Sequence, residues 1–422
     1  LNTMLGSQAD DVKLNELQDI TRKLVVSLLL SSLLILACFV IIITPYWVQP
    51  LLELGMNDGS IWPLLATSAG ATVPFFIPLP KSTSSYSELA ILLHRLVLNN
   101  YNLGLMLFKK SAKRAQKKNI HTKASFIIVS GLARAGTTSL LNALATQPKL
   151  VSLNYGHMPF LLSPNLWQTL YKPKSKKQKE RSHKDGLSIG LSSHEALEEY
   201  FFKALLQDYY LSESSLNEHS LSPKQYQQYL SYQSLVRASN EVTYLAKNNN
   251  FLLRYRSLRK HNQEFVMALL FREPLLHAAS LLEKHQQFCE LQQQDSFVLE
   301  YMNWLGHHEF GLNHKTFVFA KNYEHNYKPN TINYWLEVWL NYYHYAVQIS
   351  DQNTIFISYK RLCENKSDVL AHILKSIGHR AYEEVHQAKY LNKREVKYKP
   401  NQQLLEEAQS LYQQLLQKEV KL

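Results

Sequence analysis

The chain has 422 residues, of which 45% are hydrophobic, and it carries a formal net charge of +12. A chain of this length can bury one large core, and its basic balance favours anionic partners such as an acidic cosubstrate, anionic lipid or nucleic acid. Nucleic acid is disfavoured, because no zinc-ligand spacing, helix-turn-helix or RNP pattern accompanies the charge. Cys38, Cys289 and Cys363 form neither a metal-binding pair nor a disulfide framework, as expected in a reducing compartment.

The first predicted element is a transmembrane helix over residues 24–44, after a short amino-terminal segment at residues 1–23. The helix segment is uncharged. At about 1.5 Å per residue it is long enough to cross a hydrocarbon core of about 30 Å. Residues 61–80 are also uncharged but contain Pro63, Pro74, Pro78 and Pro80, so they are a weaker candidate for a second span.

Charges around these segments predict a topology. Arg22 and Lys23 precede the first segment and Lys81 follows the second, whereas residues 45–60 contain no Lys or Arg. By the positive-inside rule both flanks are cytoplasmic, so a transmembrane hairpin would return the rest of the chain to the cytosol, as at a bacterial inner membrane. The alternative is a single span with a lumenal domain, which the glycosylation sequon at Asn365 allows.

Residues 86–118 have the periodicity of one amphipathic helix, within a linker at residues 81–123. Its carboxyl-terminal half is strongly basic, with Lys109, Lys110, Lys113, Arg114, Lys117 and Lys118. A basic helix beside a membrane span is typical of a segment that lies on anionic membrane lipid. The alternative is a solvated face of a helix that packs on the following domain.

Residues 126–144 read as a strand, a glycine-containing turn and a helix. Phe126–Val129 is apolar and β-branched, and the helix is predicted from Ser139. Backbone amides and a helix amino terminus then point at one place, which favours an anion. Gly131 and Gly136 keep the glycine spacing of a Walker A loop, but Thr137 stands where the lysine belongs, which disfavours nucleotide hydrolysis. Such a turn also occurs without a ligand.

A second apolar strand, Phe265–Phe271, ends at Arg272 and precedes a helix that carries Ser280. With both segments in order, the chain resembles the sulfotransferase superfamily, membrane-anchored bacterial enzymes above all and Golgi enzymes more distantly. The resemblance rests on Arg134-Ala-Gly-Thr-Thr138 and on Arg272-Glu-Pro with Ser280 at the family's interval, and it spans residues 124–395. Lys247 resembles a family lysine that precedes the second strand, although Asn249 replaces the usual proline.

The resemblance implies transfer of a sulfuryl group from 3′-phosphoadenosine 5′-phosphosulfate to an acceptor hydroxyl, without a required metal. It assigns Arg134 and Lys247 as catalytic cations. The implied cosubstrate-binding residues are Arg134, Ala135, Gly136, Thr137, Thr138, Ser139, Arg272 and Ser280. The expected acceptor is a glycan or a lipid-linked saccharide, which suits a basic, membrane-anchored enzyme. The alternatives are a nucleotide-binding scaffold without catalysis and a P-loop kinase, which lacks its lysine here.

The pattern of motifs offers two candidates for the general base. Bacterial relatives often have an aspartate where this chain has His157, and the ordinary pKa of histidine, about 6.5, suits a base. The alternative for His157 is a wall of the acceptor pocket. Glu195 is the reserve candidate, near a predicted helix start where an acidic residue is favourable in any case.

The predicted fold class is α/β, with a P-loop-like parallel sheet covered by helices. Short apolar runs alternate with long helical stretches, which is typical of such sheets, and ligands then lie beyond the carboxyl ends of the strands. The predicted strands are residues 126–129, 265–271, 317–319 and 355–358. A carboxyl-terminal amphipathic helix is expected within residues 396–422.

Overall fold

The structure is a computed structural model that describes residues 32–33, 88–166, 179–180, 188–189, 194–320, 324–380 and 396–421. The chain divides into two compact units, Leu1–Lys81 and Ser82–Leu422. The predicted spans at 24–44 and 61–80 lie outside the described residues, apart from 32–33. Within the described ranges, no helix is both long enough and apolar enough to cross a membrane.

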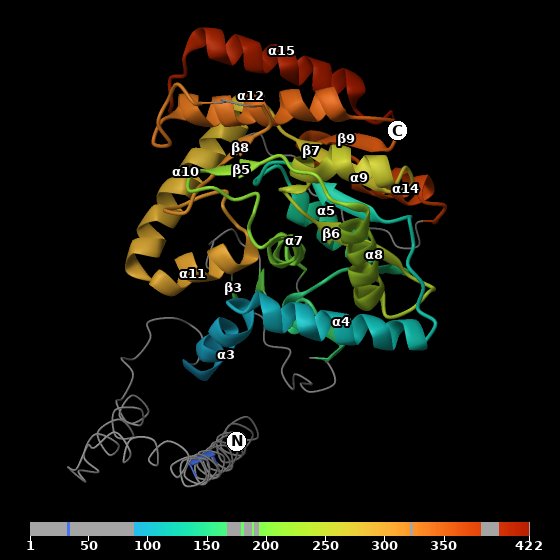
Figure 1. The fold of residues 1–422 in the computed structure, drawn as a ribbon. Coiled ribbons are helices and arrows are strands. Elements are labelled where there is room, and N and C mark those ends of the chain that lie inside the picture. The colour runs from blue at the N-terminus through green and yellow to red at the C-terminus, as the bar shows by residue number, and fades with distance from the viewer. Residues whose placement is uncertain are drawn as a thin grey trace, which may run out of the picture. The chain divides into compact units, whose positions relative to one another are not determined.

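The second unit is built on a five-stranded parallel sheet in the order β2-β6-β1-β7-β9 (Figure 1). Its strands are β1 (Ile127–Ser130), β2 (Leu150–Val151), β6 (Thr243–Lys247), β7 (Val266–Phe271) and β9 (Thr354–Ser358). Every residue of β1, β6 and β7 is buried, because helices cover both faces of the sheet. The predicted parallel α/β sheet is therefore confirmed.

The covering helices form two apolar layers. Along β1, Ile127 and Val129 belong to the core shared with α5 and α14, whereas Ile128 belongs to the larger core on the other face of the sheet. Successive side chains of a strand point to opposite faces, which explains this division. The helices are α3 (Glu88–Leu98), α4 (Tyr101–Lys117), α5 (Thr137–Ala145), α7 (Glu199–Leu206), α8 (Pro223–Arg237), α9 (Tyr255–His261), α10 (Pro274–Gln294), α11 (Ser296–Leu305), α12 (Ile332–Ile349), α13 (Tyr359–Glu364), α14 (Lys366–Ser376) and α15 (Gln402–Lys418).

Two short sheets lie outside the central one. β5 (Ser215–Asn217) pairs in parallel with β8 (Thr316–Val318), and β3 (Lys179–Glu180) pairs antiparallel with β4 (Ser188–Ile189). The strand expected at 317–319 is therefore present as β8, but it belongs to the β5 sheet. The central sheet instead contains β6, which lies between β2 and β1 and which sequence reasoning did not predict.

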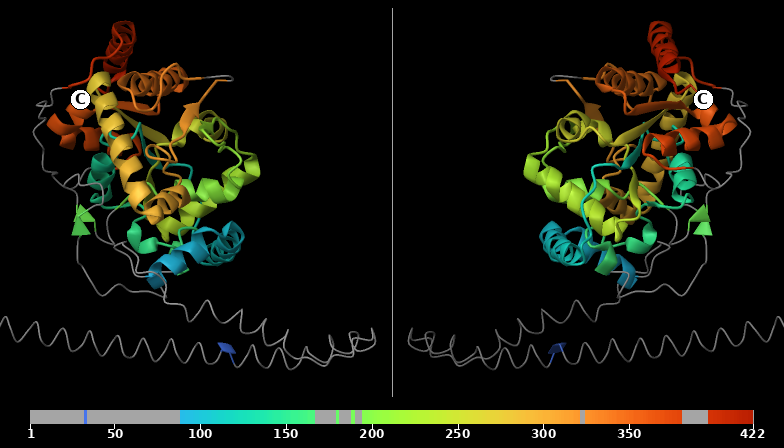
Figure 2. Two further views of the ribbon diagram at one scale, coloured as in Figure 1. Left: turned by 90° about the vertical axis from the view of Figure 1, so that its left-hand side faces the viewer. Right: turned by 90° about the vertical axis from the view of Figure 1, so that its right-hand side faces the viewer.

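The single helix expected over 86–118 is wrong, because the chain forms two helices there. α3 ends at Leu98, and the side chain of Asn100 accepts a hydrogen bond from the amide of Leu103 at 2.9 Å, which caps the start of α4. The predicted terminal helix is present as α15, with Ala408, Leu411 and Leu415 buried. α15 runs beside α12 at one end of this unit, and α4 lies at the other end (Figures 1 and 2).

Candidate active site

The candidate site lies where β1, β6 and β7 end. Val129 on β1 is in register with Lys247, the last residue of β6, and with Ala268 on β7. The turns that follow β1 and β7 therefore leave the same edge of the sheet as Lys247. In a parallel sheet this carboxyl edge is where ligands bind. The two predicted phosphate-binding segments and the predicted lysine are thus brought together by the register of three strands.

The turn from β1 to α5 depends on two glycines. Gly131 has a φ of +142°, and a Cβ there would lie 2.5 Å from the carbonyl oxygen of Leu270. Gly136 has a φ of +98°, and a Cβ there would lie 2.7 Å from the ring of Tyr359. Both contacts would be too close for any other residue. The turn consequently passes tightly over β7 and places the first turn of α5 at the sheet edge.

Arg134 stands in this turn with a φ of +70°, an unusual conformation for a residue that is not glycine. Such backbone strain is often found where a side chain is held for function. Its Nε lies 3.4 Å from Oγ of Ser280 on α10, so the first predicted segment contacts the second. The amino terminus of α5 has no side-chain cap, which leaves its first amides available to an anion.

Arg272, directly after β7, lies close to the same turn. Its guanidinium is 5.0 Å from the ring centre of Tyr359, the ring against which Gly136 packs. Its Nε is buried and has no hydrogen-bond partner among the described residues. A buried guanidinium nitrogen without a partner is costly unless an anion binds to it. Arg272 therefore fits a site for an anion.

His277 on α10 supports the turn from behind. The side chain is fully buried, and Nε2 lies 2.8 Å from the carbonyl oxygen of Ala133, to which it donates a hydrogen bond. Burial lowers the pKa of His277 to about 3, and the nearby cations Arg272 and Arg134 act in the same direction. The imidazole is therefore neutral. Sequence reasoning missed this residue, although it lies between Arg272 and Ser280.

Lys247 connects the helix start to a carboxylate. Its Nζ lies 2.7 Å from Oγ1 of Thr138 in the first turn of α5 and 2.6 Å from Oε1 of Glu195. The Lys247 and Glu195 side chains are 8% and 5% exposed, so this ion pair is shielded from water. The cation and the reserve base predicted from the sequence are thus in direct contact, beside the predicted phosphate cradle.

His157 occupies a neighbouring turn. Asn154 forms an isolated antiparallel bridge with His194, which brings the His157 turn next to Glu195. The amide of Asn154 donates to Nδ1 of His157 at 3.0 Å, as part of a capping box around a short 3-10 helix (Tyr155–His157). Burial lowers the pKa of His157, so the ring is neutral. The same Nδ1 lies 3.2 Å from the carbonyl oxygen of Asn154, so the ring either accepts from the amide with its proton on Nε2 or donates to the carbonyl with its proton on Nδ1.

Two further carboxylates stabilise the site from within the core. Asn248, next to Lys247, donates to Oε2 of Glu198 at 2.9 Å and to Oε2 of Glu199 at 3.0 Å. Arg254 binds both oxygens of Glu199 at 2.7 Å. Burial raises the pKa of Glu198, although its tyrosine and asparagine partners oppose this. This network joins the end of β6 to the start of α7, the two elements that flank the Lys247–Glu195 pair.

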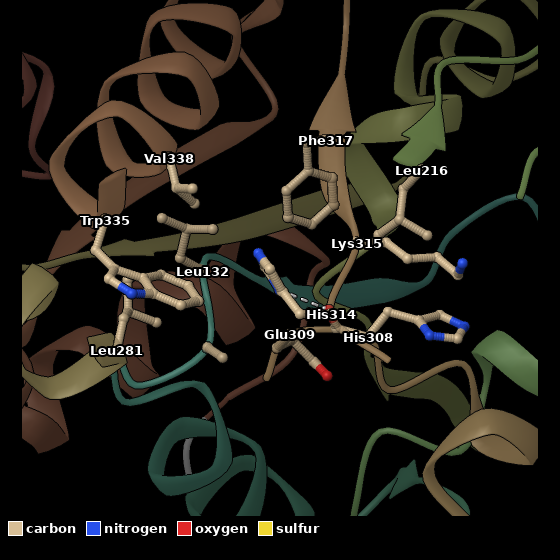
Figure 3. A pocket seen from close by; sticks show the side chains of 11 residues that line it. Leu132, Leu216, Leu281, His308, Glu309, His314, Lys315, Phe317, Trp335 and Val338 are labelled. Carbon is tan, nitrogen blue, oxygen red and sulfur yellow. Dashed lines mark hydrogen bonds between the residues drawn. The ribbon is translucent and has the colours of Figure 1, made fainter. Parts of the chain in front are cut away.

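A small cavity lies beside Leu132 and Ala133, in the turn from β1 to α5 (Figure 3). It measures about 20 Å³, enough for one water molecule. Figure 3 shows apolar groups of Leu132, Phe317 and Trp335 gathered around it, with Glu309 and His314 on another side. Among the described residues, no group of three or more His, Cys, Asp or Glu side chains could hold a metal ion.

Neither a protein-family model nor a curated protein matches the chain. Similar solved structures include sulfotransferase STF1 from Mycobacterium tuberculosis H37Rv, with 15% identity, a TM-score of 0.37, and coverage of 77% of this chain and 86% of that one. Sulfotransferase STF9 from Mycobacterium avium has 12% identity and a TM-score of 0.40, over 70% of this chain and 75% of that one. The sulfotransferase domain from the curacin biosynthetic pathway has 14% identity and a TM-score of 0.35, over 71% of this chain and 100% of that domain. TM-scores of this size do not establish a shared fold or activity.

Proposed function

We propose that the protein is a sulfotransferase that uses 3′-phosphoadenosine 5′-phosphosulfate. The observation that carries the proposal is the contact between Arg134 and Ser280, at 3.4 Å, which brings the two predicted phosphate-binding segments to one place. A donor with two separate phosphate groups needs two anion sites. The uncapped start of α5 with Arg134 supplies one, and Arg272 with Ser280 supplies the other.

The proposed reaction is an in-line displacement at sulfur. The acceptor oxygen forms a bond to sulfur while the bond from sulfur to the donor phosphate oxygen breaks, and adenosine 3′,5′-bisphosphate leaves with that electron pair. The acceptor proton passes to a carboxylate. Lys247 and Arg134 stabilise negative charge on the transferring and leaving oxygens. Thr137, Thr138 and Ser139 contribute amides and hydroxyls of the first helical turn.

We propose Glu195 as the general base in preference to His157. The Glu195 carboxylate lies 2.6 Å from Lys247 Nζ, and that nitrogen contacts the helix start where the donor would bind. His157 instead contacts the backbone of its own turn, with Nδ1 at 3.0 Å from the amide and 3.2 Å from the carbonyl oxygen of Asn154. His157 would then orient the turn beside the acceptor, the wall-like role that the sequence leaves open for it.

The two other function classes have less support. A P-loop kinase would use a lysine in the loop, and Thr137 occupies that position at the start of α5. A scaffold without catalysis would not need a buried ion pair between Lys247 and Glu195 beside the anion site. Buried ion pairs contribute little net stability, so a role in chemistry gives this pair a better explanation.

We further propose a membrane-anchored enzyme with a hydroxyl-bearing saccharide acceptor and a cytoplasmic catalytic domain. This rests on the uncharged segment at 24–44, the basic flanks and the net charge of +12. Labelling of single cysteines from either side of the membrane tests the topology. A cysteine at Asp58 should react from outside, and one at Ser125 only from inside. Reaction of the second from outside would favour the single-span alternative.

The activity is tested by transfer of labelled sulfate in membranes from cells with and without the protein. We expect a labelled product that requires the wild-type chain and is lost with Arg272→Ala. Lys260→Ala, which changes an exposed lysine of α9, is the matched control and should keep full labelling. Equal labelling with the wild type and the Arg272 variant would contradict the proposal, and the labelled product would identify the acceptor.

A further inference from the structure

The solvent-facing side of α4 carries a cluster of cations. The five basic residues of α4 and Lys118, which follows the helix, are all exposed, and the helix contains no Asp or Glu. At about 100° per residue, the side chains of Met106, Lys110, Lys113 and Lys117 fall within about 60° of one another. Met106 is 58% exposed, so a large apolar group stands among the cations. Within the described part of the chain, none of these cations pairs with a carboxylate.

The opposite side of α4 fixes how this face is presented. Gly104, Phe108 and Ala115 are buried, and α4 packs on α7 and α8. Gly104 allows a close approach, since a Cβ there would lie 2.9 Å from Leu162. Ser111 Oγ lies 3.3 Å from Ser163 Oγ. The helix therefore cannot rotate, and its cations face away from the domain.

We propose that this face of α4 docks the domain on an anionic membrane surface. A rigid helix face with clustered cations and an exposed methionine fits a lipid surface, because the cations attract anionic headgroups while the apolar group enters the interface. The same chain carries the uncharged segment at 24–44, which as a proposed span would tether the protein to a bilayer. A nucleic acid would also be attracted by the charge, but it gives the exposed methionine no role.

α4 lies close in the fold to the two elements that carry the candidate bases. α4 packs on α7, which follows Glu195, and on residues 162–163, which follow the His157 turn. A docked domain would thus hold its base near the bilayer, which suits an acceptor linked to lipid. This second step rests on the proposed function, whereas the docking itself does not.

The test uses the full chain with Cys38, Cys289 and Cys363 replaced by serine and one nitroxide label at Met106→Cys. The protein is reconstituted in vesicles of phosphatidylcholine alone or with about one third phosphatidylglycerol. We expect the label to lose access to a water-soluble nickel relaxant only in the anionic vesicles, and to regain access at high salt. A label at Ser410→Cys on α15, which lies at the opposite end of this unit, should stay accessible throughout (Figure 1).

Charge reversal supplies the matched comparison. Lys110→Glu/Lys113→Glu/Lys117→Glu should shift the docking equilibrium by at least about 100-fold toward the undocked state, because each basic residue near the surface contributes about fivefold and the new carboxylates add repulsion. Lys224→Glu/Lys260→Glu/Lys375→Glu makes the same change of charge at exposed lysines elsewhere and should dock normally.

Three results would overturn the docking proposal. The label at position 106 could stay accessible in anionic vesicles, both triple variants could lose docking equally, or the label could lose access only when RNA is added. Binding of adenosine 3′,5′-bisphosphate is measured in the same samples. Intact nucleotide binding without docking refutes only the membrane surface, whereas docking without nucleotide binding refutes only the proposed function.

Discussion

Lys247 Nζ lies 2.6 Å from Oε1 of Glu195, although 52 positions separate the two residues in the chain. Both side chains are buried, and Thr138 completes the contact at the start of α5. A buried carboxylate beside an anion-binding turn is unfavourable unless a cation compensates it. The pair therefore allows a base to stand where a negatively charged donor also has to bind.

Glu195→Gln should lower turnover by about 10²- to 10⁴-fold, the range for loss of a positioned general base. Donor affinity should be nearly unchanged, because the amide keeps a hydrogen-bond acceptor for Lys247. Steady-state sulfuryl transfer and nucleotide calorimetry measure the two quantities separately. His157→Gln is the comparison, and we expect it to retain most of the turnover. The reverse ranking of the two variants would assign the base to His157.

Arg272→Ala and Ser280→Ala should each weaken the binding of adenosine 3′,5′-bisphosphate. Removal of a charge-assisted contact to a phosphate costs about 1.5–3 kcal/mol, which is more than tenfold in affinity. Titration calorimetry with the purified variants provides the measurement, and Lys260→Ala is the control for loss of an exposed charge. Unchanged affinity in both variants would remove the 3′-phosphate assignment.

Glu199→Gln should destabilise the fold. The guanidinium of Arg254 is fully buried and both of its terminal nitrogens bind this carboxylate at 2.7 Å, so the change leaves an uncompensated buried charge. Loss of one partner of such a pair costs about 3–5 kcal/mol. Urea denaturation measures the free energy of unfolding, and the exposed Glu290→Gln on α10 should be neutral. Equal stability of the two variants would show that the network contributes nothing.

Acid should destabilise the protein partly through His277. Burial lowers its pKa to about 3, whereas an unfolded chain has the ordinary value of about 6.5. Stability from this group is complete above pH 6.5 and decreases as the pH falls toward 3, because the unfolded chain binds the proton first. His277→Gln should remove about 2 kcal/mol of the loss between pH 6.5 and 5. Urea unfolding against pH measures this, with exposed His344→Gln as control. An unchanged slope in the His277 variant would contradict the assignment.

The sequence predicted those parts of the fold that depend on local pattern. β1 and β7 are continuous apolar runs because both faces of the sheet are covered, and the turns after them carry recognisable glycine, arginine and serine spacing. β6 was missed because its five residues, Thr243–Lys247, include a tyrosine and end in a lysine. The break between α3 and α4 was missed because the apolar periodicity continues across Asn100, whose capping role is visible only in the structure.

The sequence predicted individual residues of the site but not the contacts between them. The sequence named Arg134, Lys247, Arg272 and Ser280 from their motifs, and each lies at the same edge of the sheet. It did not predict that Lys247 contacts Glu195, because that contact depends on how residues 194–198 fold back against β6. Nor did it predict the role of Asn248, since a residue that joins two buried carboxylates has no local pattern.

The central claim is tested most directly by calorimetric titration of the full chain with adenosine 3′,5′-bisphosphate in the presence of a metal chelator. The account predicts one binding site per chain, an affinity that added magnesium does not change, and much weaker binding of ATP, which lacks a 3′-phosphate for Arg272 and Ser280. Absence of binding, or binding of ATP with magnesium in its place, would contradict the account.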